Sequence, residues 1–310
     1  MRIISDYQFV NDSDRGASAA IGNFDGVHLG HRSVIEMARA AAPDAPLGVV
    51  TFQPHPRSYF APSSPPFQLM SSAARASRLA KLGVEKLYQL PFNTAMASLT
   101  PYEFADKVLH RGLGLRHVVV GADFCFGKGR AGTAQDLASY GKDLGFGVTI
   151  APLMAQSDKT VSSTAIRDAL SDARTRDAAA MLGHWHRIEG PVIGGEQRGR
   201  ELGYPTANMS IDGLHPPAFG VYAVLVDVLE GPHKGSYHGV ASMGVRPMFG
   251  VNTPNLESFI FDFKGDLYGT PLSVALVEHL RGEEKFDSLE ALITQMDADS
   301  LRARAILAAL

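Results

Sequence analysis

The first half of the chain alternates short apolar runs with segments of helical periodicity. Five runs are too short for helices and predict buried strands, at residues 19–21, 47–52, 86–90, 117–121 and 147–151. Helix signals fall between them. Because strands that alternate with helices form parallel sheets, this half predicts an α/β domain with helices on the faces of its sheet.

Helix start signals support that pattern. Residues 100–103 (TPYE) form a capping box with proline at the first helical position. Thr133 is predicted as the N-cap of a helix over residues 134–144, and Thr175 as the N-cap of a helix over residues 176–182.

The pattern changes after residue 183. Strand-like runs at residues 219–228, 237–243, 256–263 and 272–278 are separated by Gly, Pro and Asn turns. A helical pattern returns only at residues 287–290 (DSLE), which are expected to cap a pair of carboxy-terminal helices. Strands without crossover helices predict an antiparallel sheet or small barrel. We therefore predict two domains, 1–183 and 184–310.

Composition narrows the classes of partner. The 310 residues are 45% hydrophobic and 20% charged, as in an ordinary globular protein. A net charge of −3 offers no surface for a nucleic-acid backbone, so any nucleotide bound here should be small. No stretch approaches the roughly 20 apolar residues of a membrane span, and residues 1–7 lack a signal-peptide core. The lone Cys125 excludes an internal disulfide and predicts a reducing cytoplasm.

The densest chemical signal is residues 21–31 (IGNFDGVHLGH), which leave a predicted strand and open a helix. Free N–H groups and the positive dipole end at a helix start attract phosphate. His28 and His31, on either side of Gly30, are placed to donate hydrogen bonds to the α- and β-phosphates of one ATP. Metal ligands or ordinary surface histidines are the alternatives, although Cys125 is a poor further ligand for zinc.

A second signal is residues 162–167 (SSTAIR), at the start of another helical stretch. Hydroxyls at this position are often only caps. Hydroxyls followed three residues later by Arg167 also form a phosphate cradle with a guanidinium fork.

These motifs carry a family resemblance. His28-Leu29-Gly30-His31 matches the HxGH motif of the nucleotidyltransferase superfamily, and residues 162–167 resemble its second signature. Residues 51–57 (TFQPHPR) and 121–127 (GADFCFG) make the match more specific. Together the four motifs resemble the FMN adenylyltransferase module of bacterial bifunctional riboflavin kinase/FAD synthetases.

The resemblance implies a Rossmann-like nucleotidyltransferase domain in which FMN phosphate attacks the α-phosphorus of ATP directly, with Mg²⁺ on the phosphates. The implied catalytic residues are His28, His31 and Arg167. ATP would be bound by Gly22, Phe24, His28, His31, Ser163, Thr164 and Arg167. The flavin would be contacted by Pro54, His55, Pro56 and Asp123.

The second half has its own chemical candidates. Residues 194–208 (GGEQRGRELGYPTAN) are glycine-rich but lack the Gly-Lys-Ser/Thr of a Walker loop. They end in Thr206 and Asn208, which form either a surface turn or two neutral oxygen ligands for a hard cation. In the strand-like run 256–263, a period of two places Glu257 on one face with Phe259, Phe261 and Phe263. Such a carboxylate is paired structurally, points to solvent, or is held partly desolvated for proton transfer.

Both segments resemble the riboflavin kinase module of the same family, through residues 205–208 (PTAN) and 257–259 (ESF). The resemblance implies a small antiparallel barrel with terminal helices. Gly199, Gly203, Thr206 and Asn208 would bind nucleotide, with Mg²⁺ on Thr206 and Asn208. Glu257 would accept the proton of the riboflavin 5′-hydroxyl as that oxygen attacks the γ-phosphate of ATP.

The chain departs from the family pattern at residues 242–249 (SMGVRPMF), where Met248 replaces a hydroxyl-bearing residue. That change can alter flavin fit or kinase rate, but the retained Thr206, Asn208 and Glu257 predict an active kinase. The expected function is ATP-dependent conversion of riboflavin to FMN and of FMN to FAD. The alternatives are an adenylyltransferase whose kinase domain only captures substrate, and a flavin-binding regulator without catalysis.

Overall fold

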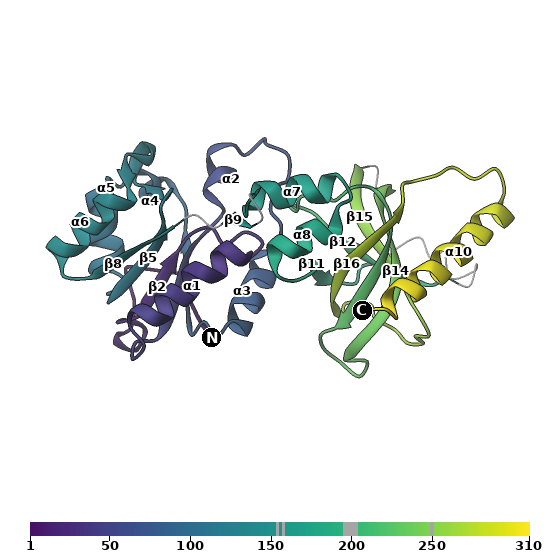
Figure 1. Ribbon diagram of the computed structural model, residues 1–310, viewed down its shortest axis with the longest axis horizontal. Coiled ribbons are helices and arrows are strands. Elements are labelled where there is room, and N and C mark those ends of the chain that lie inside the picture. Colours follow the sequence, from purple (N-terminus) through teal and green to yellow (C-terminus); the bar gives the residue numbers. More distant parts are fainter. Residues whose placement is uncertain (153–154, 157–158, 195–203, 249–250) are drawn as a thin grey trace. The chain divides into compact units, whose positions relative to one another are not determined.

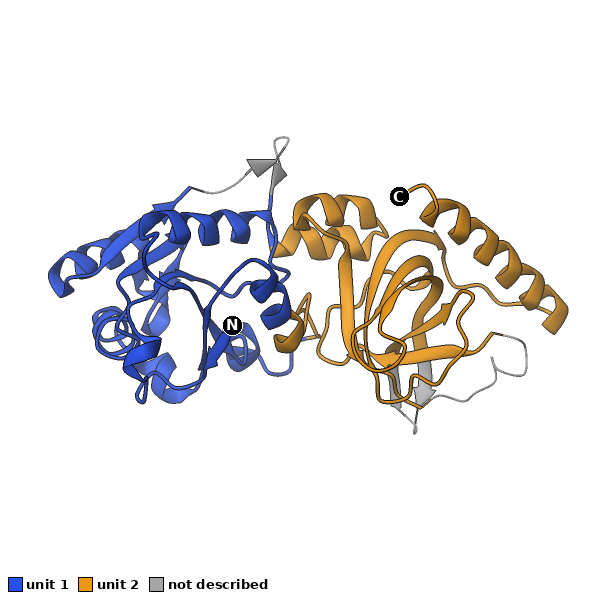
Figure 2. Ribbon diagram, turned by 90° about the horizontal axis from the view of Figure 1, so that it is seen from below, with its two compact units in different colours: residues 1–64, 75–162 blue, residues 65–74, 163–310 orange. Residues whose placement is uncertain are grey.

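The computed structural model describes residues 1–152, 155–156, 159–194, 204–248 and 251–310. The chain divides into two compact units, which are coloured blue and orange in Figure 2. Unit 1 consists of Met1–Ser64 and Arg75–Ser162, and unit 2 consists of Pro65–Ala74 and Ser163–Leu310. Unit 2 therefore includes Pro65–Ala74, a segment that interrupts the sequence of unit 1.

Unit 1 is built on a six-stranded sheet in the order β1-β4-β3-β2-β5-β8, and every pairing in it is parallel. Figure 1 labels β2, β5 and β8 of this sheet. The strands are β1 (Arg2–Ile4), β2 (Ser18–Ile21), β3 (Leu47–Gln53), β4 (Lys86–Pro91), β5 (His117–Gly121) and β8 (Gly147–Ala151). The predicted parallel α/β fold is confirmed, and only β1 was not expected. β1 is short and mostly exposed, so its apolar content alone is too small a signal.

Helices and one short hairpin connect these strands, and a second short hairpin follows β8. The helices are α1 (Leu29–Ala41), α2 (Pro56–Phe60), α3 (Ser72–Lys81), α4 (Thr94–Ser98), α5 (Pro101–Glu103) and α6 (Ala134–Leu144), with the π-helix η2 (Phe104–His110) and 3₁₀ turns η1 (Asp12–Asp14) and η3 (Lys128–Arg130). The hairpins pair β6 (Cys125–Phe126) with β7 (Gly132–Thr133) and β9 (Ala155–Gln156) with β10 (Lys159–Thr160). Two of the predicted caps, Thr100 and Thr133, are present as reciprocal capping boxes.

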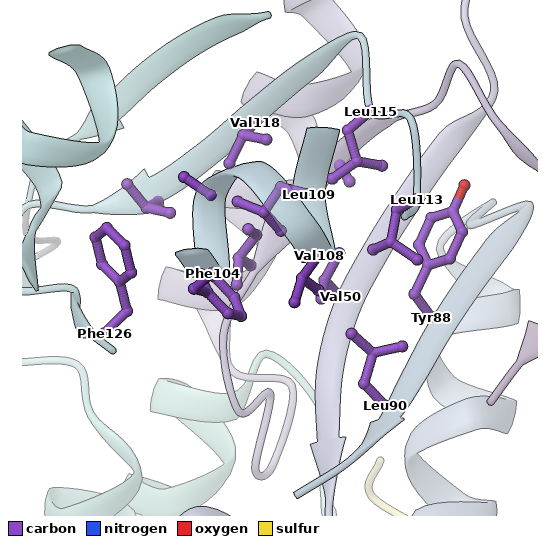
Figure 3. Packing of buried hydrophobic residues seen from close by; sticks show 14 of the residues in the cluster. Val50, Tyr88, Leu90, Phe104, Val108, Leu109, Leu113, Leu115, Val118 and Phe126 are labelled. Carbon is purple, nitrogen blue, oxygen red and sulfur yellow. The ribbon is translucent and has the colours of Figure 1, made fainter. Parts of the chain in front are cut away.

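The core of unit 1 holds the sheet against η2. Phe104 and Leu109 of η2 pack with Val50 of β3, Leu90 of β4 and Val118 of β5, and all five are buried (Figure 3). Burying a large apolar side chain contributes about 1.5–3 kcal/mol. This packing stabilises the central strands whose ends carry the site loops.

Unit 2 contains a six-stranded antiparallel sheet in the order β11-β16-β13-β14-β15-β12. The strands are β11 (His186–Pro191), β12 (Thr206–Ser210), β13 (Gly220–Val228), β14 (Gly235–Met248), β15 (Val251–Ile260) and β16 (Pro271–Arg281). The sheet curls until its two edges meet, where the Ile193 N–H donates to the Asn208 carbonyl at 2.8 Å. The predicted small antiparallel barrel is confirmed.

One long helix covers the outside of the barrel. α10 (Leu289–Leu307) packs Ala303 and Leu307 against Phe261 and Val277 of the barrel. Ser288 is its N-cap, with the hydroxyl accepting from the Ala291 N–H at 3.1 Å. The predicted pair of terminal helices is wrong, because no glycine or proline interrupts the helix.

Unit 2 also includes α7 (Ser163–Ser171) and α8 (Thr175–Leu182). The prediction that Thr175 caps α8 is wrong: α8 begins at Thr175, and Arg174 is its N-cap. The Thr175 hydroxyl instead donates to the Val277 carbonyl of β16 at 2.8 Å. Tertiary structure thus uses this hydroxyl to attach the helix pair to the barrel.

Candidate active sites

Three predicted site segments of unit 1 follow neighbouring strands. The HxGH segment follows β2, the Pro54–Pro56 segment follows β3, and Asp123 follows β5. β3, β2 and β5 are adjacent and parallel, so their carboxyl ends share one edge of the sheet. The strand order also changes direction between β2 and β5, and open α/β sheets bind ligands at such a switch point.

His28 is held in one tautomer by its place at the start of α1. It is the N-cap of that helix, and its Nδ1 accepts from the His31 N–H at 3.3 Å. An accepting Nδ1 leaves the proton of a neutral imidazole on Nε2. Burial lowers the pKa of His28 to about 4, so the ring is neutral at pH 7. His28 therefore presents a neutral N–H donor.

The His31 ring stacks on that of His28. Their centroids are 3.7 Å apart and their planes differ by 17°, and the Phe24 ring lies 5.0 Å from His31. Desolvation lowers the pKa of His31 well below its usual range, and electrostatic interactions with His28 and Arg75 lower this pKa further. The His31 Nδ1 is buried and has no hydrogen-bond partner in the described part of the chain. An unsatisfied buried polar atom requires an explanation, and a bound ligand is one.

The histidine stack depends on Gly30. A Cβ on Gly30 would lie 3.2 Å from both Cε1 and Nδ1 of His28, closer than ordinary van der Waals contact. A side chain at this position would require the His28 ring, which stacks on His31, to shift by a few tenths of an ångström. The glycine of the HxGH motif thus has a packing reason in this chain.

The loop before His28 holds unusual backbone conformations. Phe24 and Val27 have φ values of 51° and 45°. Side chains other than glycine pay about 1–3 kcal/mol each in this left-handed region. Both are almost fully buried, at 1% and 0% exposure, and that packing maintains the strain. Strain of this kind is concentrated at functional sites.

Sequence reasoning missed a buried cation behind the HxGH loop. Arg75 of α3 is 3% exposed and donates to the Asn23 carbonyl at 3.3 Å and to the Gln53 Oε1 at 3.4 Å. Desolvation lowers its pKa, and Asp25 opposes that shift. Arg75 lies four residues before the fully buried Leu79, so an arginine on the apolar stripe of the helix was the available signal.

The burial of His28 predicts a pH-dependent stability. The unfolded chain binds the His28 proton at pH 6.5 and the folded chain only at about 4, so the free energy of unfolding falls as the pH falls between these values. At pH 5, the titration of His28 accounts for a loss of about 2 kcal/mol in the free energy of unfolding. The variant His28→Asn keeps a side-chain acceptor for the helix cap. Urea unfolding should show a decrease from pH 7 to pH 5 that is smaller in this variant by about that amount.

Two outcomes check this attribution. Between pH 8 and pH 7 the variant and the wild type should change almost in parallel, because there His28 is neutral in the folded chain and mostly neutral in the unfolded chain. Equal losses of stability from pH 7 to pH 5 would show that His28 does not titrate as its burial requires.

The predicted flavin segment leads into a group of aromatic rings. His55 caps α2, with its Nδ1 accepting from the Arg57 N–H at 3.0 Å. The rings of Tyr59, Phe60 and Phe92 make mutual edge contacts with centroids 5.1–5.7 Å apart. Phe60 is 67% exposed. Sequence reasoning missed this cluster because Phe92 is far from the other two rings along the chain.

Asp123 lies in the exposed turn between β5 and β6. Its side chain is close to Gly121, where a Cβ would come within 2.9 Å of the Asp123 Oδ1. The neighbouring Phe124 and Phe126 rings are stacked, 5.5 Å apart. The turn thus presents a carboxylate beside aromatic surface at the carboxyl end of β5.

Residues 163–167 of the second nucleotidyltransferase signature lie in unit 2, at the start of α7. Ser163 and Thr164 are in its first turn, and Arg167 donates from Nη2 to the Thr164 Oγ1 at 3.4 Å. The Arg167 Nη1 also donates to the Phe67 carbonyl at 3.3 Å, and the guanidinium lies 5.7 Å from the Phe67 ring centroid. The structure thus brings the hydroxyls and the arginine of this signature together.

Strands β12 and β15 bring the kinase candidates together. Asn208 and Glu257 are paired in register, so their side chains share a face of the sheet. Asn255 donates from Nδ2 to the Glu257 Oε1 at 3.1 Å and to the Asn208 Oδ1 at 3.5 Å. This bridging amide was not predicted, although it lies two residues from Glu257 and therefore on the same face.

The predicted aromatic face around Glu257 is only partly correct. β15 ends at Ile260, and Asp262 has a φ of 57°, which breaks the alternation of side chains. Phe259 and Phe261 belong to the outer apolar cluster under α10, whereas Phe263 packs against the cluster inside the barrel. A period of two cannot be extended past the end of a strand.

A cavity of about 290 Å³ opens beside Thr206 and Asn208. Its other polar lining residues are Ser258, Lys264, Asp266 and Tyr268. Its apolar lining residues are Val192, Pro205, Ala207, Ile260, Phe263 and Leu267. Gly199 and Gly203, predicted to bind nucleotide here, lie outside the described residues, as does the side chain of Met248.

The fold and the unit 1 site define a nucleotidyltransferase of the HxGH type, joined in one chain to an antiparallel barrel with a second polar site. Residues 10–165 match the family model described as FAD synthetase, and residues 182–307 match the model described as riboflavin kinase. The chain therefore belongs to the bifunctional riboflavin kinase/FMN adenylyltransferase family. The predicted pair of activities, with the adenylyltransferase first along the chain, is confirmed.

Relatives with that name match over nearly their whole length. The protein from Pseudomonas fluorescens is 40% identical over 99% of this chain and 98% of its own, and that from Bacillus subtilis is 33% identical over 98% and 96%. A crystal structure named as a macrolide-efflux protein from Streptococcus pneumoniae has a TM-score of 0.83 and 33% identity over 96% of both chains. In the present chain, no helix among the described residues has the length and apolar character of a membrane span.

Proposed function

We propose specific residue roles for the two reactions, with residues 1–183 as the adenylyltransferase domain and residues 184–310 as the kinase domain. The observation that carries the first assignment is the stacked pair His28 and His31, neutral and aligned at the start of α1. Donors arranged before the reaction starts stabilise charge that develops in the transition state.

In adenylyl transfer, a phosphate oxygen of FMN attacks the α-phosphorus of ATP, and the bond from that phosphorus to the bridging oxygen of pyrophosphate breaks. The His28 Nε2–H and the His31 ring donate to the phosphates as negative charge moves to the leaving group. Gly22 and Phe24 line the nucleotide side, and Ser163, Thr164 and Arg167 hold ATP phosphates through hydroxyls and a guanidinium.

The flavin is assigned to the Pro54–Pro56 segment and Asp123, with the ring cluster of Tyr59, Phe60 and Phe92 as its platform. The isoalloxazine ring is planar and aromatic, and exposed aromatic side chains stack on such rings at about 1–3 kcal/mol per ring. The exposed Phe60 supplies that surface beside α2.

Replacing Phe60 with alanine is therefore expected to raise the KM for FMN about tenfold in adenylylation. The KM for ATP should remain within about twofold of wild type, because the variant leaves the HxGH segment intact. Steady-state kinetics with supplied FMN measure both constants. Phe9→Ala is the matched control, since Phe9 is 82% exposed in the same unit. An unchanged KM for FMN in Phe60→Ala would remove Phe60 from the flavin site.

The kinase assignment includes Mg²⁺ on Thr206 and Asn208. These side chains offer neutral oxygens beside the cavity, and Mg²⁺ commonly takes few protein ligands while the substrate phosphates supply others. The described residues contain no group of three or more His, Cys, Asp or Glu that could form an all-protein cage. The donor set therefore fits an ion shared with nucleotide phosphates, where it would neutralise phosphate charge.

Glu257 is assigned as the general base of the kinase. Its carboxylate receives the proton of the riboflavin 5′-hydroxyl while that oxygen forms its bond to the γ-phosphorus and ADP leaves. Asn255 orients the carboxylate by donating to its Oε1. The same amide contacts Asn208, so base and metal ligand are positioned together.

Product analysis tests the whole proposal. The purified chain, incubated with riboflavin, ATP and Mg²⁺, should yield FMN and FAD by mass spectrometry, and omission of Mg²⁺ should suppress both. FAD formed only from supplied FMN would indicate a kinase domain that merely captures flavin. We also propose that the chain acts in the cytoplasm without a nucleic-acid partner, which its free Cys125 and its net charge of −3 support.

A further inference from the structure

A histidine from the barrel side of unit 2 contacts the helix that carries Arg167. His215 lies in the loop that follows β12, and its Nε2 is 3.1 Å from the Arg167 carbonyl and 3.1 Å from the Ser171 Oγ. A carbonyl can only accept, so the Nε2 of His215 carries the proton and donates it. The Arg167 carbonyl also accepts within α7, so the imidazole is an additional partner.

The main chain of His215 is itself fixed. Its N–H donates to the Gln68 carbonyl at 2.8 Å, and Leu214 pairs with Gln68 in a parallel bridge. The partly buried ring loses solvation, which lowers the pKa of His215 despite the opposing hydrogen bond to Arg167. The imidazole is therefore a neutral donor held from two directions.

The side chain of Arg167 is held by the residue next to Gln68. Its Nη1 donates to the Phe67 carbonyl, and its guanidinium lies over the Phe67 ring. His215 thus contacts the backbone of Arg167, while the segment bonded to His215 contacts its guanidinium. Three segments of unit 2 therefore contact one another: α7, residues 67–68 and residues 214–215.

We propose that His215 is a positioning residue for FMN adenylylation: from a loop of the kinase barrel, it sets the place of Arg167. The inference rests on the proposed phosphate-binding role of Arg167. A misplacement of about 1 Å in a group that orients substrate can reduce a rate by about 100-fold. The loss of one of several contacts should have a smaller effect.

The test compares His215→Phe, which keeps a planar ring without the donor, with His215→Gln, which restores an N–H near the Nε2 position. In His215→Phe, the kcat for FMN adenylylation should fall about tenfold. The KM for FMN and the kcat for riboflavin phosphorylation should both stay within about twofold. His215→Gln should recover most of the lost rate.

Thr175→Val is the matched control for loosened helix packing. It removes another buried hydrogen bond between the α7–α8 pair and the barrel, from the Thr175 Oγ1 to the Val277 carbonyl. Adenylylation in this variant should stay near the wild-type rate at a temperature well below its melting point. An equal loss in Thr175→Val and His215→Phe, or a parallel loss of kinase activity in His215→Phe, would overturn the positioning role.

Arg167→Ala separates this inference from the assignment beneath it. Full adenylylation in Arg167→Ala would overturn the role of Arg167 itself. A large loss in Arg167→Ala combined with wild-type kinetics in His215→Phe would overturn only the role of His215. Loss in both variants, with rescue by His215→Gln, supports the proposal.

Discussion

Replacing both His28 and His31 with alanine is expected to lower the rate of FAD formation from FMN at least about 1000-fold and to leave FMN formation within about twofold of wild type. Removing one preorganised donor from a developing negative charge costs about 100- to 1000-fold. The rings act as one unit, stacked at 3.7 Å, so the two losses should not add fully. Supplied FMN with ATP measures the first reaction, and riboflavin with ATP the second.

The structural cost of this change can be measured separately. His28 caps α1, so its replacement by alanine also removes about 1 kcal/mol of stability. The single variant His28→Asn retains a capping acceptor but cannot place a donor at the Nε2 position. It should therefore lose adenylylation with little loss of stability. Normal FAD formation in the double variant would show that the pair does not contact the reacting phosphates.

The second large effect is expected for Glu257→Gln, which should reduce phosphorylation of riboflavin by about 100- to 10,000-fold. The amide keeps an Oε1 that accepts from Asn255, so the strand pairing and the hydrogen bond survive while the proton acceptor is lost. Conversion of supplied FMN to FAD should be unaffected. Activity is followed by FMN formation under saturating ATP and Mg²⁺.

Glu278→Gln provides a matched control for this experiment. Glu278 belongs to β16 in the same sheet and forms an ion pair with Arg176 at 2.6 Å. Its replacement should leave both activities close to wild type, because surface ion pairs contribute only about 0–1 kcal/mol. If Glu257→Gln retains the kinase rate of this control, another group accepts the proton of riboflavin.

The bulk of the architecture was predictable because it is encoded locally. A parallel strand is a short apolar run between turn residues, so β5 and β8 were predicted with the bounds that the structure has, although β8, at the edge of the sheet, is buried only at Ala151. The capping boxes at Thr100 and Thr133 were predictable because their partners lie three residues away. Predictions failed where a local pattern does not determine the contact. Thr175, for example, donates to the carbonyl of Val277, which is distant in sequence.

Local order along the chain determined which chemistry this protein carries. A strand, a glycine-containing turn and a helix start place His28 and His31 together without any distant contact, because residues three apart at a helix start are neighbours. The alternation along a strand likewise placed Glu257 on the face that holds Asn255.

Tertiary structure decided what supports those groups. The buried Arg75 behind the HxGH loop, the ring cluster of Phe60 with Phe92, and the contact of His215 with Arg167 all join segments far apart in sequence. Sequence periodicity does not predict these long-range contacts, since burial and hydrogen bonding between distant segments arise only in the packed chain. The order of residues along the chain specifies the reactive groups, whereas packing selects the partners that hold these groups in place.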